Sequence, residues 1–405
     1  AQGCRTRRLT AGSAAARTWA AQLAGLRPLA EAKAAEAQGE LAPPLSLAAA
    51  NGHAPRHRVV FMTSCMEEDY FWTYCTPLFS SLAEAFEEQG SGAASHGVGV
   101  DMQVLVATAG VAATSLERTE AAFAFVRFAS YEEDDGELSR HEDPREAENH
   151  RRTAYQSLKL DQYLRLWQEH IFGRKVDYVV CMDSDMLVAR PFGHVFEYLA
   201  QHRVDVAFTY YDGRREVPWG TAEELATTRR HGYVRLQGGL LLMRNGIEAL
   251  RWFAWWVSLT RTMLHDVQNG GPQQERWSAL HKEFKGPSQA ALAFLLAQGE
   301  FEVMESVERC CSSVRTVHLE APQRGGEEVE VRMLGLPARY MNDAESTEDG
   351  SLPPSVLIVH LKGHWWRSVL PHGDEDLVVP TRSYDWNREA FELWRRHSRA
   401  LRPAA

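Results

Sequence analysis

Two carboxylates stand at the end of an apolar run near the middle of the chain. The run is Tyr178-Val-Val-Cys-Met-Asp-Ser-Asp-Met-Leu-Val188, and its first half has the composition of a buried strand. Because unpaired charges are costly inside a core, we expect Asp183 and Asp185 to lie where the strand leaves it. Carboxylate oxygens suit Mg²⁺ or Mn²⁺, which usually keep positions open for phosphate oxygens. The spacing therefore indicates a cation site for a phosphate-bearing ligand; a pair of solvated loop aspartates has the same pattern.

A histidine much later in the chain could complete that site. His360 ends an apolar stretch and opens His360-Leu361-Lys362-Gly363-His364-Trp365-Trp366-Arg367. Neutral imidazole is a common metal ligand. Gly363 would let a phosphate approach the backbone, and Lys362 and Arg367 could neutralise its charge. A surface turn with incidental cations is the alternative, but the aspartate pair favours the functional interpretation.

Four further polar residues could contact such a ligand or a second substrate. Lys159 lies on a predicted helix before the aspartates, and Gln289 follows Gly286-Pro287-Ser288 at a predicted helix start. Gln237 precedes two glycines in an apolar run, and Asp212 follows a predicted strand. Ordinary solvated surface positions would look the same.

The elements that position these residues alternate between strand and helix. We predict strands over Val59–Ser64, Val100–Val106 and Phe123–Phe128, and helices over Leu78–Phe86 and Thr153–Phe172. This alternation predicts an α/β fold with a mainly parallel sheet. Ligands in such sheets bind beyond the carboxyl ends of the strands, which is where Thr63, Ser64 and the aspartate pair would lie.

The second half of the chain continues the pattern. The predicted elements are a helix from Pro191-Phe192, strands over Val204–Thr209, Leu236–Met243, Phe301–Met304 and Val356–His360, and helices over Ile247–Leu264, Ser288–Leu296 and Asp385–Leu401. Glycine inside a strand often marks the close approach of a ligand or of other backbone, which applies to Gly238 and Gly239. Trp252, Trp255 and Trp256 are expected to pack in the core.

Composition limits the class of protein. The chain has 405 residues, of which 44% are hydrophobic and 24% are charged, as in soluble globular proteins. A net charge of -10 without a run of Lys and Arg speaks against a nucleic-acid surface. An acidic loop is expected over Glu132–Glu148. We predict a stem or linker over residues 1–57 and one large domain over residues 58–401.

The cysteines leave the compartment open. Six cysteines are too few for a disulfide scaffold, and none forms a metal-type Cys-x-x-Cys. Cys65 and Cys75 could pair. The chain begins with Ala1 rather than Met, so a signal or membrane anchor could precede it.

Together these motifs resemble those of nucleotide-sugar glycosyltransferases of the GT-A fold, over about residues 58 to 370. They are most similar to retaining groups that include glycogenin-like and plant xylosyl- or galactosyltransferases. The resemblance is carried by Thr63-Ser64, Lys159, Met182-Asp183-Ser184-Asp185, Gln237-Gly238-Gly239, Gly286-Pro287-Ser288-Gln289 and His360-Leu361-Lys362-Gly363.

The resemblance implies a Rossmann-like GT-A sheet and a donor that is a nucleotide-diphosphate sugar, with a UDP-sugar expected. It implies that Asp183, Asp185 and His360 hold Mn²⁺ or Mg²⁺ against the donor diphosphate, and that Thr63 and Ser64 contact the nucleotide base. The other expected donor contacts are Lys159, Ser184, Lys362, Gly363 and Arg367. Gln237 and Gln289 would position the sugar, Asp212 would contact the acceptor, and the leaving phosphate would take the proton of the acceptor hydroxyl.

The acceptor could be a glycan, a protein or a small molecule. The N-terminal stem favours a Golgi or other secretory membrane with a lumenal domain over a cytoplasmic location. Three departures leave the sugar open. Ser288 stands where many relatives carry Asp, and an Asn/Ala-Gly type segment appears here as Gln237-Gly238-Gly239. Trp366 stands where a cation is expected, with Arg367 one residue later.

Two other functions fit parts of the pattern. A haloacid-dehalogenase-type phosphatase also ends a strand with Asp-x-Asp, with the first Asp as nucleophile, and Gly373-Asp374-Glu375-Asp376 resembles its later acidic motif. Met186-Leu187-Val188 is unlike its Thr-bearing turn. A non-catalytic sugar- or metal-binding protein could use Trp365 and Trp366, two of twelve tryptophans, for stacking.

Overall fold

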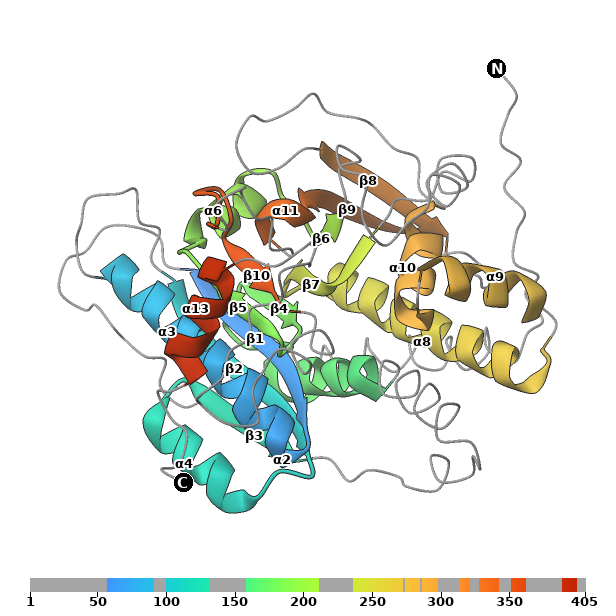
Figure 1. The fold of residues 1–405 in the computed structure, drawn as a ribbon. Helices are drawn as coiled ribbons and strands as arrows, with labels where there is room; N and C mark the ends of the chain where they lie inside the picture. The colour runs from blue at the N-terminus through green and yellow to red at the C-terminus, as the bar shows by residue number, and fades with distance from the viewer. Residues whose placement is uncertain are drawn as a thin grey trace.

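The computed structural model describes ten segments of the chain. They are residues 57–90, 100–130, 158–210, 236–271, 274–284, 286–297, 313–320, 328–341, 351–361 and 388–398. Eight strands form one sheet in the order β3-β2-β1-β4-β7-β6-β9-β8 (Figure 1). Their bounds are β1 His57–Met66, β2 Val100–Ala109, β3 Val126–Ser130, β4 Tyr178–Met182, β6 Val206–Tyr210, β7 Leu236–Arg244, β8 Ser313–Glu320 and β9 Glu328–Pro337.

The sheet is mixed but mainly parallel. β1 pairs in parallel with β2 and β4, β2 with β3, and β6 with β9. β7 is antiparallel to both of its neighbours, β4 and β6, and β8 is antiparallel to β9. Six strands therefore point one way and two point the other. This confirms the predicted α/β fold with a mainly parallel sheet flanked by helices.

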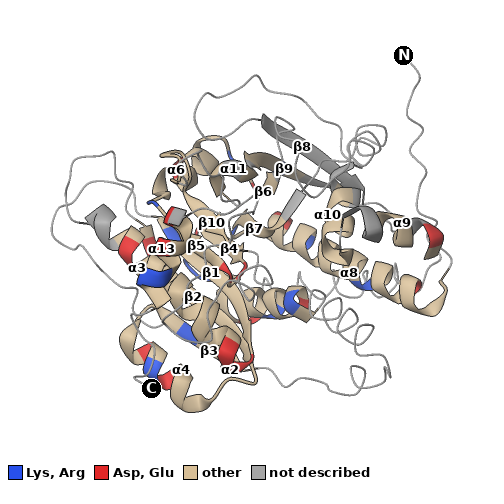
Figure 2. Cartoon of the chain, in the orientation of Figure 1, with Lys and Arg blue, Asp and Glu red and all other residues tan. Residues whose placement is uncertain are grey.

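The central strands are apolar because both of their faces are covered. All five residues of β4 are buried, and the strand carries no charge, whereas charged residues are frequent on the helices (Figure 2). Val179 and Cys181 face one core, while Tyr178, Val180 and Met182 face the other. The helix described over residues 158–166 and the π-helix η2 (Trp167–Ile171) cover the first face together with α8 (Ile247–Asn269), α9 (Gln274–Phe284) and α10 (Pro287–Ala297).

The opposite face is covered by helices from the first half of the chain. They are α3 (Thr76–Gly90) and α6 (Gly193–Gln201), with the π-helix η1 (Phe71–Cys75) beside α3. The short helices α2 (Glu68–Tyr70) and α11 (Ala338–Met341) follow β1 and β9, and α4 (Ala113–Ala122) lies between β2 and β3 in the sequence. The tryptophan-rich helix packs as predicted, because Trp252, Trp255 and Trp256 of α8 are buried.

A small second sheet lies next to the main one. β5 (Met186–Val188) pairs antiparallel with β10 (Ile358–His360). The last described helix, α13 (Arg388–Ser398), shares a separate hydrophobic core with these two strands through Phe391 and Trp394. Segments far apart in the sequence are thereby brought next to the end of β4.

Several predicted boundaries need correction. The third strand begins at Val126 rather than Phe123, the sixth begins at Val206 rather than Val204, and the late strand begins at Ile358 rather than Val356. Residues 123–125 and 356–357 form no ladder, although Phe125 and Val356 are buried, so their apolar character reflects burial outside the sheet. Elements that sequence reasoning missed are α2, η1, α4, β5, α9, β8, β9 and α11. The predicted strand Phe301–Met304 and loop Glu132–Glu148 lie outside the described residues.

One disulfide joins Cys65, near the end of β1, to Cys75 in η1, with 6.4 Å between the Cα atoms. The proposed pairing is thus confirmed. Cys181 is a free and buried thiol. Within the described ranges, no helix combines the length and apolar composition that crossing a bilayer requires.

Candidate metal centre and adjoining pocket

The two aspartates lie at the carboxyl end of β4, as predicted. The backbone N–H of Asp183 donates to the carbonyl oxygen of Gly239 in β7 at 2.8 Å. The chain then turns over Ser184, and the N–H of Met186, the first residue of β5, donates to the Asp183 carbonyl oxygen at 3.3 Å. This tight turn leaves both carboxylates at the edge of the core, with partial exposure of 23% for the Asp183 side chain and 12% for that of Asp185.

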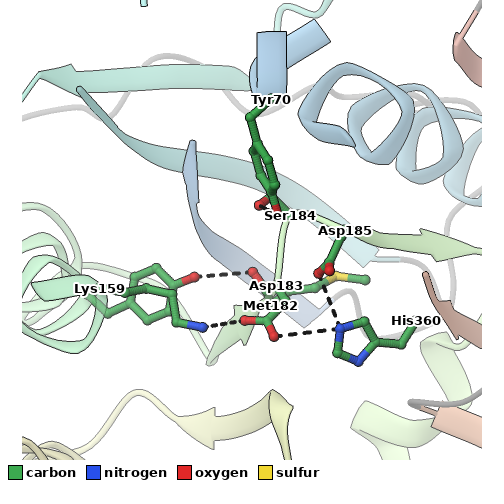
Figure 3. A network of polar contacts seen from close by, with 8 residues as sticks. Tyr70, Lys159, Met182, Asp183, Ser184, Asp185 and His360 are labelled. Carbon is green, nitrogen blue, oxygen red and sulfur yellow. Dashed lines mark hydrogen bonds and ion pairs between the residues drawn. The ribbon is translucent and has the colours of Figure 1, made fainter. Parts of the chain in front are cut away.

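His360 reaches the aspartates because β10 pairs with β5. The register places His360 opposite Met186, and Leu361 N–H donates to the Asp185 carbonyl oxygen at 2.8 Å. His360 Nε2 lies 3.2 Å from Asp185 Oδ1 and 3.8 Å from Asp183 Oδ2 (Figure 3). A ligand atom from each of the three residues lies within 4.8 Å of the others. The structure thus brings together the three residues that the sequence assigned to a metal.

The chemistry of this donor set fits a divalent cation. Two carboxylate oxygens and one imidazole nitrogen are ligands that Mn²⁺ and Mg²⁺ accept. Opposite ligands of a cation with bonds of about 2.1 Å lie about 4.2 Å apart, so a spread of at most 4.8 Å requires only a small contraction. Two neighbouring negative charges at the edge of a core also need a counter-charge.

Lys159 supplies part of that counter-charge. Its Nζ lies 2.5 Å from Asp183 Oδ1, while the other oxygen of Asp183 faces His360 (Figure 3). One turn later on the same helix, the Tyr163 hydroxyl donates to the Met182 carbonyl oxygen at 3.2 Å. The helix is therefore fixed to the end of β4 at two points, and Lys159 is within reach of any ligand on the cluster.

A small pocket adjoins the Lys159 side of the cluster. It is lined by Lys159, Leu160, Tyr163, Cys181, Asp183, Gly238, Gly239, Leu241, Trp256 and Ser288. Trp256 Nε1 donates to the Ser288 carbonyl oxygen at 2.7 Å, which ties the start of α10 to α8. Gln289 lies beside the pocket, because a methyl group at position 238 would be 3.1 Å from its Cγ.

Burial raises the pKa of the Cys181 thiol well above its usual range, although the nearby Lys159 ammonium opposes this. The thiol under the pocket is therefore protonated and is a poor nucleophile.

Thr63 and Ser64 lie near the carboxyl end of β1, but each residue is only 1% exposed. Thr63 Oγ1 has no hydrogen-bond partner among the described residues. Ser184 is also buried, and its Oγ donates to the Tyr70 hydroxyl at 3.4 Å. Contact of Thr63 and Ser64 with a nucleotide base stays a prediction.

Sequence reasoning missed Tyr70 and Tyr163. Tyr70 packs against Tyr74 in a tilted arrangement, with ring centroids 4.6 Å apart, in the segment that the Cys65–Cys75 disulfide closes. Two tyrosines four residues apart were the available signal.

Four of the predicted site residues, Asp212, Lys362, Gly363 and Arg367, lie outside the described residues. Gln237 lies in β7, where the structure describes its backbone and not its side chain. The roles assigned to these residues stay predictions.

Among the comparisons with known proteins, solved structures match at low sequence identity. No protein-family profile matches the chain, and no curated protein sequence matches it. One solved structure with a similar fold is the galactosyltransferase LgtC in complex with donor and acceptor sugar analogues. It is 13% identical, the match covers 86% of this chain and 97% of that chain, and the TM-score is 0.40.

An active-site mutant of LgtC gives 14% identity, the same coverage and a TM-score of 0.39. The bifunctional glycosyltransferase WbbM gives 14% identity over 51% of this chain and 34% of its own, with a TM-score of 0.29.

Proposed function

We propose that this chain is a metal-dependent glycosyltransferase of the GT-A type, which moves a sugar from a nucleotide-diphosphate sugar to an acceptor hydroxyl. The observation that supports it is the convergence of Asp183, Asp185 and His360 at the carboxyl end of β4. In α/β sheets, this edge is where phosphate-bearing ligands bind.

The residues of the site have separate roles toward the cation, the phosphates and the sugar. A Mn²⁺ or Mg²⁺ ion held there would bind diphosphate oxygens and stabilise the charge of the leaving nucleotide, which we take to be UDP. Asp183 Oδ2, Asp185 Oδ1 and His360 Nε2 face one space. Lys159 holds the second Asp183 oxygen and can add a donor toward phosphate or sugar. Gln289 borders the same pocket and is placed to bind a sugar hydroxyl.

Retention of anomeric configuration is part of the proposal. Among the described residues that line the pocket, Asp183 is the one carboxylate, and it is bonded to Lys159. An enzymic base is therefore not evident there, which supports transfer of the acceptor proton to the leaving phosphate. Proton NMR of the first product would show the configuration, and an inverted product would contradict retention.

The disulfide supports a secretory-pathway location. Disulfides persist in oxidising compartments and are rare in the cytosol, and Cys65 and Cys75 are paired in the core. We propose a lumenal domain preceded by a stem that ends before β1 begins at His57. Thiol trapping of the protein in intact cells would find both cysteines protected; free thiols would contradict the location.

Release of UDP from a panel of UDP-sugars tests the function directly. We expect release that requires Mn²⁺ or Mg²⁺, stops with a chelator and is lost in Asp185→Ala, because that change removes a cation ligand. Glu117→Ala is the matched control, since it removes an exposed carboxylate of α4. UDP binding that depends on Mn²⁺ without turnover would indicate a non-catalytic binding protein, and absence of both UDP and Mn²⁺ binding would refute the donor site.

A further inference from the structure

We infer that Gly239 is a positioning residue of the cation cluster, where a larger residue would force Asp183 and His360 apart. The inference rests on the proposed function, because it assigns Gly239 a role toward the cation. β7 runs beside β4, with Leu240 opposite Met182, and the Gly239 carbonyl oxygen accepts the backbone N–H of Asp183. The backbone of residue 239 is therefore fixed next to the first aspartate.

The space at position 239 is already occupied by the cluster. A methyl group on Gly239 would lie 2.9 Å from Asp183 Oδ2 and 2.9 Å from His360 Cε1. It would also lie 2.5 Å from the Met186 Cε methyl. Gly239 is not among the residues with left-handed backbone, so the need for glycine here is one of space and not of conformation.

The ligands have little freedom to yield. Lys159 holds the other oxygen of Asp183 at 2.5 Å, and the backbone of Asp183 is bonded to β7 itself. His360 is held by the pairing of β10 with β5, and its side chain is only 9% exposed. Met186 is a flexible side chain and can move. A residue larger than glycine should therefore displace one or both ligands by several tenths of an ångström.

The neighbouring glycine is a matched control. A methyl group on Gly238 would lie 3.1 Å from Gln289 Cγ and no closer than 3.6 Å to the next nearest atoms, both of the same side chain. The long side chain of Gln289 can adjust. Gly238→Ala and Gly239→Ala thus make the same chemical change on adjacent residues of β7, and only the second meets the cation ligands.

The test is the affinity for Mn²⁺, measured by calorimetry on the full chain without donor. We expect Gly239→Ala to weaken Mn²⁺ binding about tenfold or more, the range seen when the groups that orient metal ligands are changed. We expect Gly238→Ala to change it less than about twofold. Urea unfolding of the metal-free proteins checks that each variant folds, with a single cooperative transition as the expected result.

A double variant separates the ligands from Met186. Gly239→Ala/Met186→Leu removes the Cε methyl from the clash by a swap that cores tolerate, and it also serves if the single variant does not fold. Weak binding in the double variant is the expected result. If either Gly239→Ala or the double variant binds Mn²⁺ as tightly as wild type does, the inference is overturned and the proposed function still stands. A wild-type protein that binds no Mn²⁺ would overturn both.

Discussion

At the scale of single residues, Asp183 is shared between two partners. Its Oδ1 bonds to the Lys159 ammonium at 2.5 Å, and its Oδ2 faces His360 at 3.8 Å. One oxygen is thus left for a cation, so Asp183 is suited to bind through a single atom. The ion pair with Lys159 also places a positive charge next to the candidate cation site. This ammonium lowers the attraction of the site for a cation.

Replacement of Lys159 should therefore separate the binding of cation from that of donor. We expect Lys159→Met to tighten Mn²⁺ binding by roughly three- to tenfold, because a like charge a few ångströms away is removed. The affinity for UDP-sugar should fall, since a donor toward anionic oxygens is lost. Calorimetry with each ligand measures both.

Arg165→Met is the control, because it removes the same charge from an exposed position on the same helix. If the Lys159 and Arg165 variants behave alike, the charge of Lys159 has no local effect on the cluster.

The three candidate metal ligands could be predicted from the sequence because their residue types and their places at strand ends both carry the signal. Tyr70 could not be assigned in this way. Its hydroxyl reaches Ser184 only because the chain turns at Glu67, a non-glycine residue with φ of 70°. Such a local conformation depends on its surroundings, here a bond from Glu67 N–H to the Ala109 carbonyl oxygen of β2.

At the scale of elements, long apolar strands could be predicted from the sequence. Short elements, and elements that form through contacts with distant parts of the chain, could not. β5 has three residues and exists through its pairing with β10, which is far away in the sequence. β9 did carry a signal, because Glu328-Val329-Glu330-Val331-Arg332-Met333 alternates as half-buried strands do, and Val331 and Met333 are buried.

α4 has no apolar stripe to predict it, since its buried residues are Ser115 and Thr119. Its start is stabilised from another element. The Glu68 carboxylate accepts the backbone N–H of Ala112 at 2.8 Å and the Ser115 hydroxyl. Burial alone would raise the pKa of Glu68, but these bonds and one from Trp72 lower it overall.

The disulfide makes a prediction at the same scale, because it joins β1 to η1. Cys65→Ser/Cys75→Ser should lower the free energy of unfolding by about 2–3 kcal/mol, as expected for a closed loop of about ten residues. Urea unfolding with and without reductant measures this. Reductant should destabilise the wild type by a similar amount and leave the double variant unchanged. A wild type that is insensitive to complete reduction would show that the bond adds nothing to stability.

At the scale of the whole molecule, the site is built from distant parts of the chain, and the last described helix packs against the two strands beside it. α13 packs against the β5–β10 pair, in which β5 directly follows Asp185 and β10 ends at His360. Trp394 Nε1 donates to the Thr73 carbonyl oxygen at 2.8 Å. The sequence predicts a helix over Asp385–Leu401. It could not show where the helix docks, because docking depends on a surface formed by strands that are themselves assembled over long range.

The docking of α13 should make stability depend on pH through His397. Its Nδ1 lies 2.9 Å from Ser80 Oγ of α3, and the side chain is buried. Burial lowers the pKa of His397 from its ordinary value of 6.5 to about 4, and the adjacent Arg396 guanidinium adds to this. Glu84 Oε2, 3.8 Å from Nε2, acts in the opposite direction.

Between pH 6.5 and 4 the unfolded chain binds a proton at His397 that the folded chain does not. The free energy of unfolding therefore rises with pH through this window, and the contribution is complete above pH 6.5. His397→Gln keeps a partner for Ser80. Between pH 7 and pH 5, we expect the free energy of unfolding, measured with urea, to fall by about 1–2 kcal/mol less in this variant than in wild type.

His265→Gln is the control, because it makes the same substitution at a side chain that is 72% exposed. Equal pH dependence in wild type and His397→Gln would mean that His397 takes up its proton in the folded state, with Glu84 offsetting the burial. α13 packs against β5 and β10, and β10 ends at His360. Acid that weakens the docking of α13 should therefore also weaken Mn²⁺ binding. The loss of Mn²⁺ affinity on acidification should be larger in wild type than in His397→Gln, where only protonation of the ligands contributes.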